Sequence, residues 1–231
     1  MKNFYKLAMT AAIVGFGLGT LNVAQAATVS LSSSNQGWWN TRDTNNNLND
    51  NYITANVTGN GYRSFFTFDL GALAGVSSAT LQVQRFEGSG DPIQTLGLFD
   101  VSTSADVLSQ KVNNPDIDIY NDLGSGKNYG TFKVSTSGDQ NEILSFVLNS
   151  DAIADINANS GQFFSIGGAL LGDLGIVDQY LFGFSGLGSS ATLVVDTDIT
   201  TVPEPGTLGG AVLVGITGLC LKRKRKAFQT V

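Results

Sequence analysis

The chain has 231 residues, with no histidine, one cysteine (Cys220), 13 basic and 19 acidic side chains. The lack of histidine excludes Ser-His-Asp hydrolysis, Cys-His catalysis and His-ligated zinc. Residues 27–202 contain 18 acidic but only 6 basic residues. This net charge of −12 argues against nucleic acid as a partner, because its binding needs cations that neutralise phosphates. Carboxylate chemistry remains, for example at Asp116 and Asp118, but so acidic a chain produces such pairs by chance, and we expect no enzyme.

The N-terminus has the features of a secretory signal peptide. Two lysines precede an uncharged apolar stretch over residues 7–21, and Ala24 and Ala26 then form the small-x-small pattern of a signal-peptidase site. We expect signal peptidase to cleave after Ala26, with Ala27 as the alternative; an uncleaved anchor helix is the other interpretation. Residues 1–26 are therefore assigned to a signal helix, and we expect the general secretion machinery to export the residues after it.

The exported segment begins with a predicted strand over residues 28–31. Residues 32–51 are rich in Ser and Asn and have little apolar surface to bury, so we expect a solvated loop. Trp38 and Trp39 in this loop, with Tyr52 just after it, are the candidates for glycan binding, because aromatic faces pack on pyranose rings. The alternative is that the adjacent tryptophans cap the end of a sandwich, with one of them buried.

Two segments with period-two alternation predict the central strands. Residues 63–70 place one set of side chains on one face (Ser64, Phe66, Phe68, Leu70) and the other set on the opposite face (Phe65, Thr67, Asp69). After a short connection over 73–77, residues 79–84 alternate in the same way, with Ala79, Leu81 and Val83 inward. This pattern is typical of half-buried antiparallel strands.

Later segments repeat the pattern. We predict further strands over residues 95–101, 129–134 (Phe132 and Val134 inward), 143–148 (Leu144, Phe146 and Leu148 on one side), 163–166, 180–184 and 191–195. One short helix is expected over 150–157, with Ser150 as N-cap and Asp151 near the positive end of the helix dipole. Short strands separated by Gly, Asn and Ser predict an all-β fold, an antiparallel β-sandwich spanning residues 27–200.

The polar connections contain oxygen ligands that suit calcium, although the twelve-residue calcium-loop pattern is absent and solvated turns explain these residues equally well. The metal question therefore stays open, with these candidates: Asp43, Asn45, Asn47, Asp50, Asp116 and Asp118. Arg63 and Asp69 are a possible structural ion pair at the ends of their strand.

The C-terminal region, residues 201–231, has three parts in order. Pro203, Glu204 and Pro205 come first, and Gly206 to Leu221 form a sixteen-residue uncharged run. As a helix this run rises about 24 Å, slightly less than the roughly 30 Å of a bilayer core, and we predict a single transmembrane helix. Its apolar positions are Gly206, Leu208, Val212, Leu213, Val214, Ile216, Leu219 and Leu221. Five cations come next and belong on the cytoplasmic side: Lys222, Arg223, Lys224, Arg225 and Lys226.

This arrangement resembles the PEP-CTERM sorting signal of Gram-negative envelope proteins. The resemblance covers residues 201–226 and implies recognition by an exosortase, an integral-membrane transpeptidase; the five residues 227–231 after the cations depart from the pattern. The resemblance also implies a precursor tethered at the outer face of the inner membrane and a product in the cell envelope or outside the cell. A simple C-terminal membrane anchor is the alternative.

A second resemblance concerns the exported domain. The sequence Arg63-Ser-Phe-Phe-Thr-Phe-Asp-Leu70, a Gly-containing spacer and Ser78-Ala-Thr-Leu81 look like secreted β-sandwich modules of the DNRLRE type, which are related in shape to carbohydrate-binding jelly rolls. Tyr180-Leu-Phe-Gly-Phe-Ser185 also resembles a segment of exported PEP-CTERM proteins. These resemblances imply a jelly-roll-like domain with a structural or adhesive role in the envelope or in an exopolysaccharide (biofilm) matrix. A non-catalytic carbohydrate-binding module is the alternative function.

Overall fold

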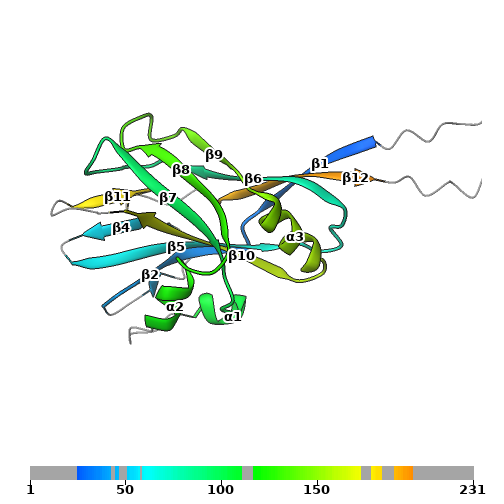
Figure 1. The fold of residues 1–231 in the computed structure, drawn as a ribbon, viewed down its shortest axis with the longest axis horizontal. Coiled ribbons are helices and arrows are strands. Elements are labelled where there is room, and N and C mark those ends of the chain that lie inside the picture. The colour runs from blue at the N-terminus through cyan, green and yellow to red at the C-terminus, as the bar shows by residue number, and fades with distance from the viewer. Residues whose placement is uncertain are drawn as a thin grey trace, which may run out of the picture. The chain divides into compact units, whose positions relative to one another are not determined.

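The computed structural model describes residues 25–42, 45–46, 51–57, 59–110, 117–172, 178–183 and 190–199. Over these residues the chain forms twelve strands in two antiparallel sheets, with three short helices (Figure 1). The predicted signal helix lies outside the described residues except for the backbone of its last two residues, Gln25 and Ala26, which begin the first strand and are not helical. The whole predicted C-terminal sorting region also lies outside the described residues. Within the described ranges no helix has the length and apolar character needed to span a bilayer.

The smaller sheet has four strands, in the order β1 (Gln25–Ser32), β12 (Thr192–Ile199), β6 (Val76–Gln84) and β9 (Ile143–Val147). The larger sheet has eight strands. Its main order is β11 (Gln179–Leu181), β4 (Thr54–Val57), β5 (Asn60–Asp69), β10 (Phe163–Leu171), β7 (Ile93–Asp100) and β8 (Asn128–Ser135). Beside this path, β2 (Asn35–Asn40) pairs with β5, and the two-residue β3 (Asn45–Asn46) pairs with β2.

The eight principal strands pair in a nested order. The first pairs with the last (β1 with β12), the second with the seventh (β5 with β10), the third with the sixth (β6 with β9) and the two middle strands with each other (β7 with β8). All four pairs are antiparallel, and they alternate between the two sheets. The chain therefore has the topology of one long hairpin that is folded over into two layers.

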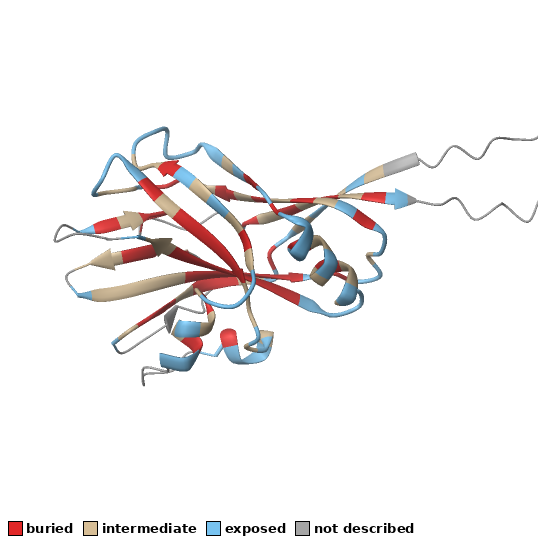
Figure 2. Ribbon diagram, viewed as in Figure 1, coloured by how far each residue is buried: buried red, intermediate tan, exposed pale blue. Residues whose placement is uncertain are grey.

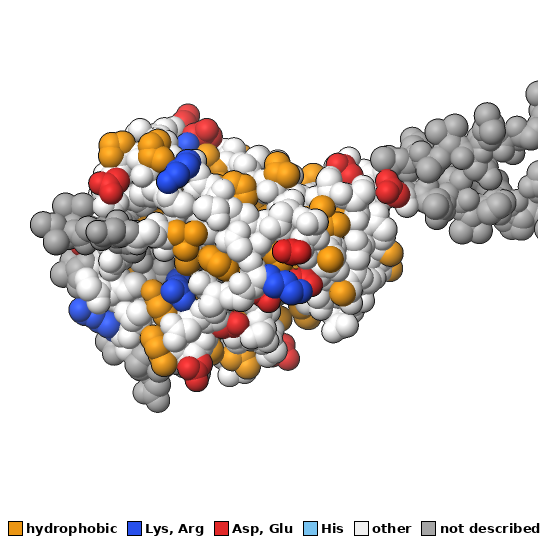
Figure 3. Space-filling view, in the orientation of Figure 1, with side chains coloured by type: hydrophobic (Ala, Val, Ile, Leu, Met, Phe, Trp, Pro, Cys, Tyr) orange, Lys and Arg blue, Asp and Glu red, His pale blue; other side chains and the backbone are white. Residues whose placement is uncertain are grey.

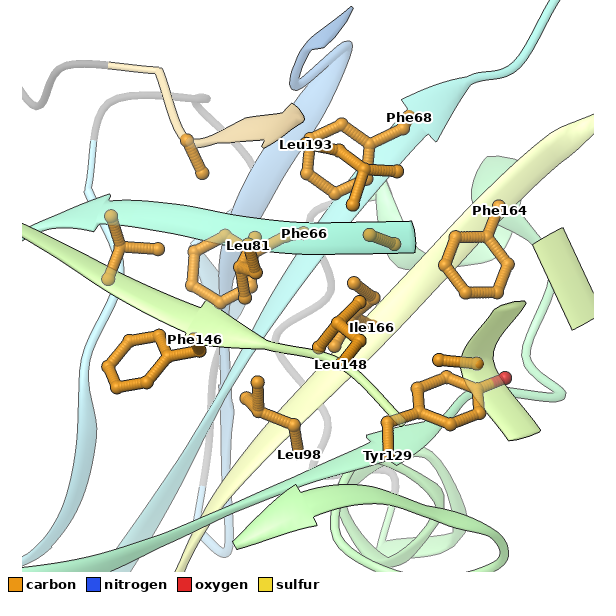
Figure 4. Packing of buried hydrophobic residues seen from close by; sticks show 14 of the residues in the cluster. Phe66, Phe68, Leu81, Leu98, Tyr129, Phe146, Leu148, Phe164, Ile166 and Leu193 are labelled. Carbon is orange, nitrogen blue, oxygen red and sulfur yellow. The ribbon is translucent and has the colours of Figure 1, made fainter. Parts of the chain in front are cut away.

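The main hydrophobic core lies between the two sheets. The predicted alternation is confirmed here, because Phe66, Phe68 and Leu70 of the β5 segment face Leu81 and Val83 of β6 across the core. Figure 4 shows this packing, with further buried side chains at Leu98, Tyr129, Phe146, Leu148, Phe164, Ile166 and Leu193. Buried residues are continuous along β5, β7 and β10 in the centre of the larger sheet (Figure 2).

The opposite face of β5 is buried as well. Phe65 packs with Trp39, Leu108, Ile119 and Leu123 in a second, smaller cluster. The last three come from α1 (Ala105–Leu108), from α2 (Ile117–Asp122) and from the residue just after α2, which cover the outer face of the larger sheet. The expectation of a single helix is therefore wrong, because two very short helices with one buried apolar residue each carry no readable helical period.

Residues 32–51 do not form a loop as expected, since β2 and β3 lie within them, and β4 was not predicted at all. Gln36 explains how the polar strand β2 can be partly buried. Its Oε1 accepts hydrogen bonds from Ser33 Oγ (2.9 Å) and from the backbone N–H of Ala191 (2.8 Å), so the polar groups satisfy one another inside the fold. Composition alone overestimated the exposure of this segment.

Two further boundaries differ from the prediction. Helix α3 (Ser150–Ala158) is present, but its N-cap is Asn149, whose Oδ1 accepts from the N–H groups of Asp151 (3.1 Å) and Ala152 (3.2 Å). Ser150 is therefore the first helical residue. The strand predicted over 180–184 stops after Leu181, because Phe182 adopts a left-handed backbone conformation with φ of 66°.

The chain enters and leaves this domain at one end. The first residue of β1, Gln25, is paired with the last residue of β12, Ile199, and Ala26 is paired with Asp198. In Figure 1 the start of β1 and the end of β12 lie side by side and point away from the rest of the domain. The segments before Gln25 and after Ile199 are therefore connected to neighbouring points of the domain.

Candidate functional site

The three predicted glycan-binding aromatics do not form a platform. Trp39 is buried beneath α1 and α2, and Tyr52 is fully buried in the core between the sheets. Only Trp38 is partly exposed; its ring meets that of Tyr62 edge-on, with the ring centres 5.1 Å apart, and its indole N–H donates to Asn51 Oδ1 at 3.1 Å. The predicted platform is therefore wrong. One tryptophan is buried, as the alternative expected.

The expected pair of Arg63 and Asp69 is also wrong. Arg63 Nη1 donates to the carbonyl oxygens of Tyr120 (2.8 Å) and Asn121 (3.0 Å), and its guanidinium lies 4.2 Å from the centre of the Tyr120 ring. Asp69 instead accepts from the backbone N–H of Gly71 at 3.0 Å. Arg63 thus fastens α2 to the outer face of the larger sheet, which is a structural role.

The predicted calcium ligands are not brought together by the described chain. Asp118 lies exposed on α2, and Asn45 lies in the short strand β3. The other candidates (Asp43, Asn47, Asp50 and Asp116) lie outside the described residues. Within the described ranges, no group of three or more Asp, Glu, His or Cys residues is placed to hold a metal ion.

The described structure contains a groove that sequence reasoning missed. It consists of two adjoining hollows of about 490 Å³ and 230 Å³, which share Val101, Asn159, Phe163 and Ser165. We call it the α1–α3 groove. One wall is the segment that leads from β7 into α1, and the other is formed by the end of α3 and the start of β10.

The first wall is held by one carboxylate. Asp122 accepts four hydrogen bonds, from the N–H and Oγ of Ser102 (3.3 and 2.7 Å) and from the N–H and Oγ1 of Thr103 (2.8 and 2.6 Å). Partial burial raises the pKa of the Asp122 carboxyl, but the bonds from Thr103 and Ser102 outweigh it, so the pKa lies below its ordinary value. The segment before α1 is therefore fixed.

The second wall contains a compact charge network. Both carboxylate oxygens of Asp155 accept from Lys127 Nζ (2.6 and 2.9 Å), and Oδ2 also accepts from the Tyr129 hydroxyl (2.8 Å). The hydrogen bond to Asp155 raises the pKa of Lys127. The pKa of Tyr129 is raised mainly by burial and, to a smaller extent, by its hydrogen bond to Asp155. Asp100 Oδ1 accepts from the backbone N–H of Lys127 at 2.6 Å. These groups hold the wall in place.

Other groups in the groove have no such partners among the described residues. The Ser104 hydroxyl makes no capping bond to α1, and neither the Asp106 carboxylate nor the Gln162 amide bonds to any described residue. Beside them lies Phe163, an aromatic side chain that is 52% exposed. The groove therefore presents an apolar ring next to available donors and acceptors, which is an arrangement for binding a polar ligand.

One feature of the sequence does point to this site. Phe163 and Phe164 are adjacent in a predicted strand, so the pleat must send one ring to each face. Phe164 enters the main core, which leaves Phe163 on the outer face. The opposite wall, at Ser104 and Asp106, is far away along the chain and is brought near only by the tertiary fold.

On the face shown in Figure 3, acidic and basic side chains are scattered, without a large patch of either sign. A comparison with protein-family models found no match, and neither did a search of curated proteins. Function is therefore inferred from the residues and geometry described above.

Proposed function

We propose that the protein is an exported structural or adhesive component of the cell envelope or of an extracellular polysaccharide matrix. An exosortase would process it through Pro203, Glu204 and Pro205. The observation that supports this topology is the pairing of β1 with β12, in which Ala27, the first residue after the expected cleavage site, is paired with Thr197. A precursor whose leader and sorting tail leave the domain at one place can engage the same membrane with both. The rest of the domain then extends away from that membrane.

The proposed fold is a jelly-roll-like sandwich covering residues 27–200. Its support is the nested antiparallel pairing of eight strands distributed over two sheets. We also propose that the domain is not an enzyme. Asp122 and Asp155 are engaged as acceptors that hold the groove walls, which favours binding over acid–base chemistry.

The sorting proposal is tested by replacing Pro203, Glu204 and Pro205 with alanine in the full-length chain. The expected result is accumulation of unprocessed precursor in the membrane fraction, measured by immunoblotting and by mass spectrometry of the C-terminus. The matched control is a triple alanine variant of residues 228–230, which lie after the cations. Equal processing of both variants would count against exosortase recognition and favour a simple membrane anchor.

A second candidate function is non-catalytic carbohydrate binding. The α1–α3 groove favours it, because an exposed aromatic ring stands beside available polar groups on rigid walls. This function is compatible with the first, since a matrix protein that is tethered or released can bind polysaccharide.

A further inference from the structure

We infer that the α1–α3 groove is a binding site for a neutral carbohydrate, with Phe163 stacking on a pyranose face and Asp106 and Gln162 bonding to sugar hydroxyls. The inference rests on the proposed carbohydrate binding and is independent of the sorting proposal. It moves the ligand site from the tryptophan pair to the groove between α1 and the start of β10.

The aromatic part of the site is an exposed ring on a strand whose backbone is fixed. Phe163 is the first residue of β10 and is paired with Asp69 of β5, so its backbone is fixed by the sheet. Its neighbour Phe164 is buried, and this anchors the ring on the outer face. The C–H groups on a sugar face are weakly positive and pack on the negative face of an aromatic ring. Phe163 therefore has the exposure and chemistry of a stacking residue.

The walls that carry the polar part of the site are fixed by hydrogen bonds. Ser102, Thr103 and Lys127 are already committed to Asp122 and Asp155, so the walls are in place before binding. The Ser104 hydroxyl, Asp106 carboxylate and Gln162 amide supply both donors and acceptors. Fixed walls limit the conformational entropy that binding costs to the ordering of these exposed side chains. Such a mixed set can bond to sugar hydroxyls, each of which both donates and accepts.

Charge and size restrict the ligand further. The described residues that line the groove include three carboxylates (Asp100, Asp106 and Asp155) and one cation, Lys127. This excess of negative charge repels an anionic polysaccharide. The larger hollow, about 490 Å³, falls within the roughly 300–1,000 Å³ of small-molecule sites. A neutral sugar chain whose terminal residues occupy the groove fits both the negative charge and the volume of the site.

The test uses the full-length protein in detergent, titrated calorimetrically with neutral cello-, manno- and galacto-hexasaccharides and with an alginate hexasaccharide. We expect binding to a neutral sugar, weakened about tenfold or more in Phe163→Ala, as when other aromatic stacking residues are truncated. Asp106→Asn and Gln162→Ala should each weaken it several-fold. The matched control is Ile143→Ala, which removes an equally exposed apolar side chain (52%) from the other sheet.

The possible outcomes separate the site from the function. If neither a neutral sugar nor alginate binds, both the carbohydrate function and this site are refuted. If a neutral sugar binds equally to the wild type, Phe163→Ala and Asp106→Asn, the function stands and the site is wrong. Binding to alginate alone overturns the neutral class. Unchanged thermal unfolding of each variant excludes misfolding as the cause of weaker sugar binding. If Phe163→Ala does not fold, sugar binding by Asp106→Asn and Gln162→Ala decides whether the groove is the site.

Discussion

Replacing Asp122 with asparagine tests whether one carboxylate holds the wall of the α1–α3 groove. Asparagine keeps one acceptor oxygen but places an amide NH₂ where the second oxygen was. That NH₂ must face either the N–H of Ser102 or the N–H of Thr103. The hydrogen bond that the Ser102 N–H donates is longer than the one from the Thr103 N–H, 3.3 Å against 2.8 Å. We therefore expect the NH₂ to face Ser102 and the bond from the Ser102 N–H to be lost.

The expected magnitude comes from this count of bonds. Hydrogen bonds to a charged group contribute about 1.5–3 kcal/mol each and neutral ones about 0.5–1.5 kcal/mol. The backbone bond from Ser102 is lost, the Ser102 hydroxyl must turn to accept from the new NH₂, and the two bonds from Thr103 lose their charge. Asp122 is only partly buried, so solvent screening reduces the sum. We expect a loss of about 2 kcal/mol in the free energy of unfolding, together with weaker sugar binding.

The assay is urea unfolding of the full-length chain, followed by tryptophan fluorescence, across pH. Because the folded-state pKa of Asp122 is lowered, its contribution is fully present above the unfolded-state pKa of about 3.9 and is lost as the pH falls through the lower folded-state pKa. The difference between wild type and Asp122→Asn should be constant above about pH 5 and shrink below about pH 4. Asp91→Asn, at an exposed position, is the control. A difference that persists undiminished at about pH 3, or no difference at about pH 7, refutes the reasoning.

Two other substitutions test the interior and the outer face. Gln36→Met keeps the side-chain volume but leaves the buried N–H of Ala191 without its acceptor, so we expect the free energy of unfolding to fall by about 2 kcal/mol. The control is Gln82→Met, at a partly exposed position, which should cost less than about 0.5 kcal/mol. Equal losses in a urea titration would contradict this. Arg63→Met removes the bonds to the carbonyls of α2, and hydrogen exchange in residues 119–123 should become about tenfold faster while β6 is unchanged. Uniform acceleration of both would show that Arg63 stabilises the whole domain instead.

The core between the two sheets was predictable because half-buried strands repeat at period two. Phe66 and Phe68 in β5, and Leu81 and Val83 in β6, show this period clearly and all lie in the core. The second buried face of β5 was not predictable. Phe65 is covered by α1 and α2, whose apolar contacts come from single residues and produce no period of their own.

The polar strand β2 and the α1–α3 groove escaped prediction for a different reason. Gln36 is buried because Ala191, far away in the sequence, supplies a donor that satisfies it. Likewise, Asp106 and Gln162 are near each other only because α1 and the start of β10 are adjacent in the fold. Tertiary contacts decide both features, and the local pattern does not contain them.

The position of β12 has a mechanical consequence. This strand lies between β1 and β6 and is hydrogen-bonded to both. A pulling force that enters at Ile199 acts along the strand axis, so it loads the two ladders together in shear instead of peeling their bonds apart one by one. Resistance to such a force depends on the rate of forced unfolding, not on equilibrium stability. A C-terminal attachment that pulls along β12 would therefore carry load through two hydrogen-bonded ladders at once.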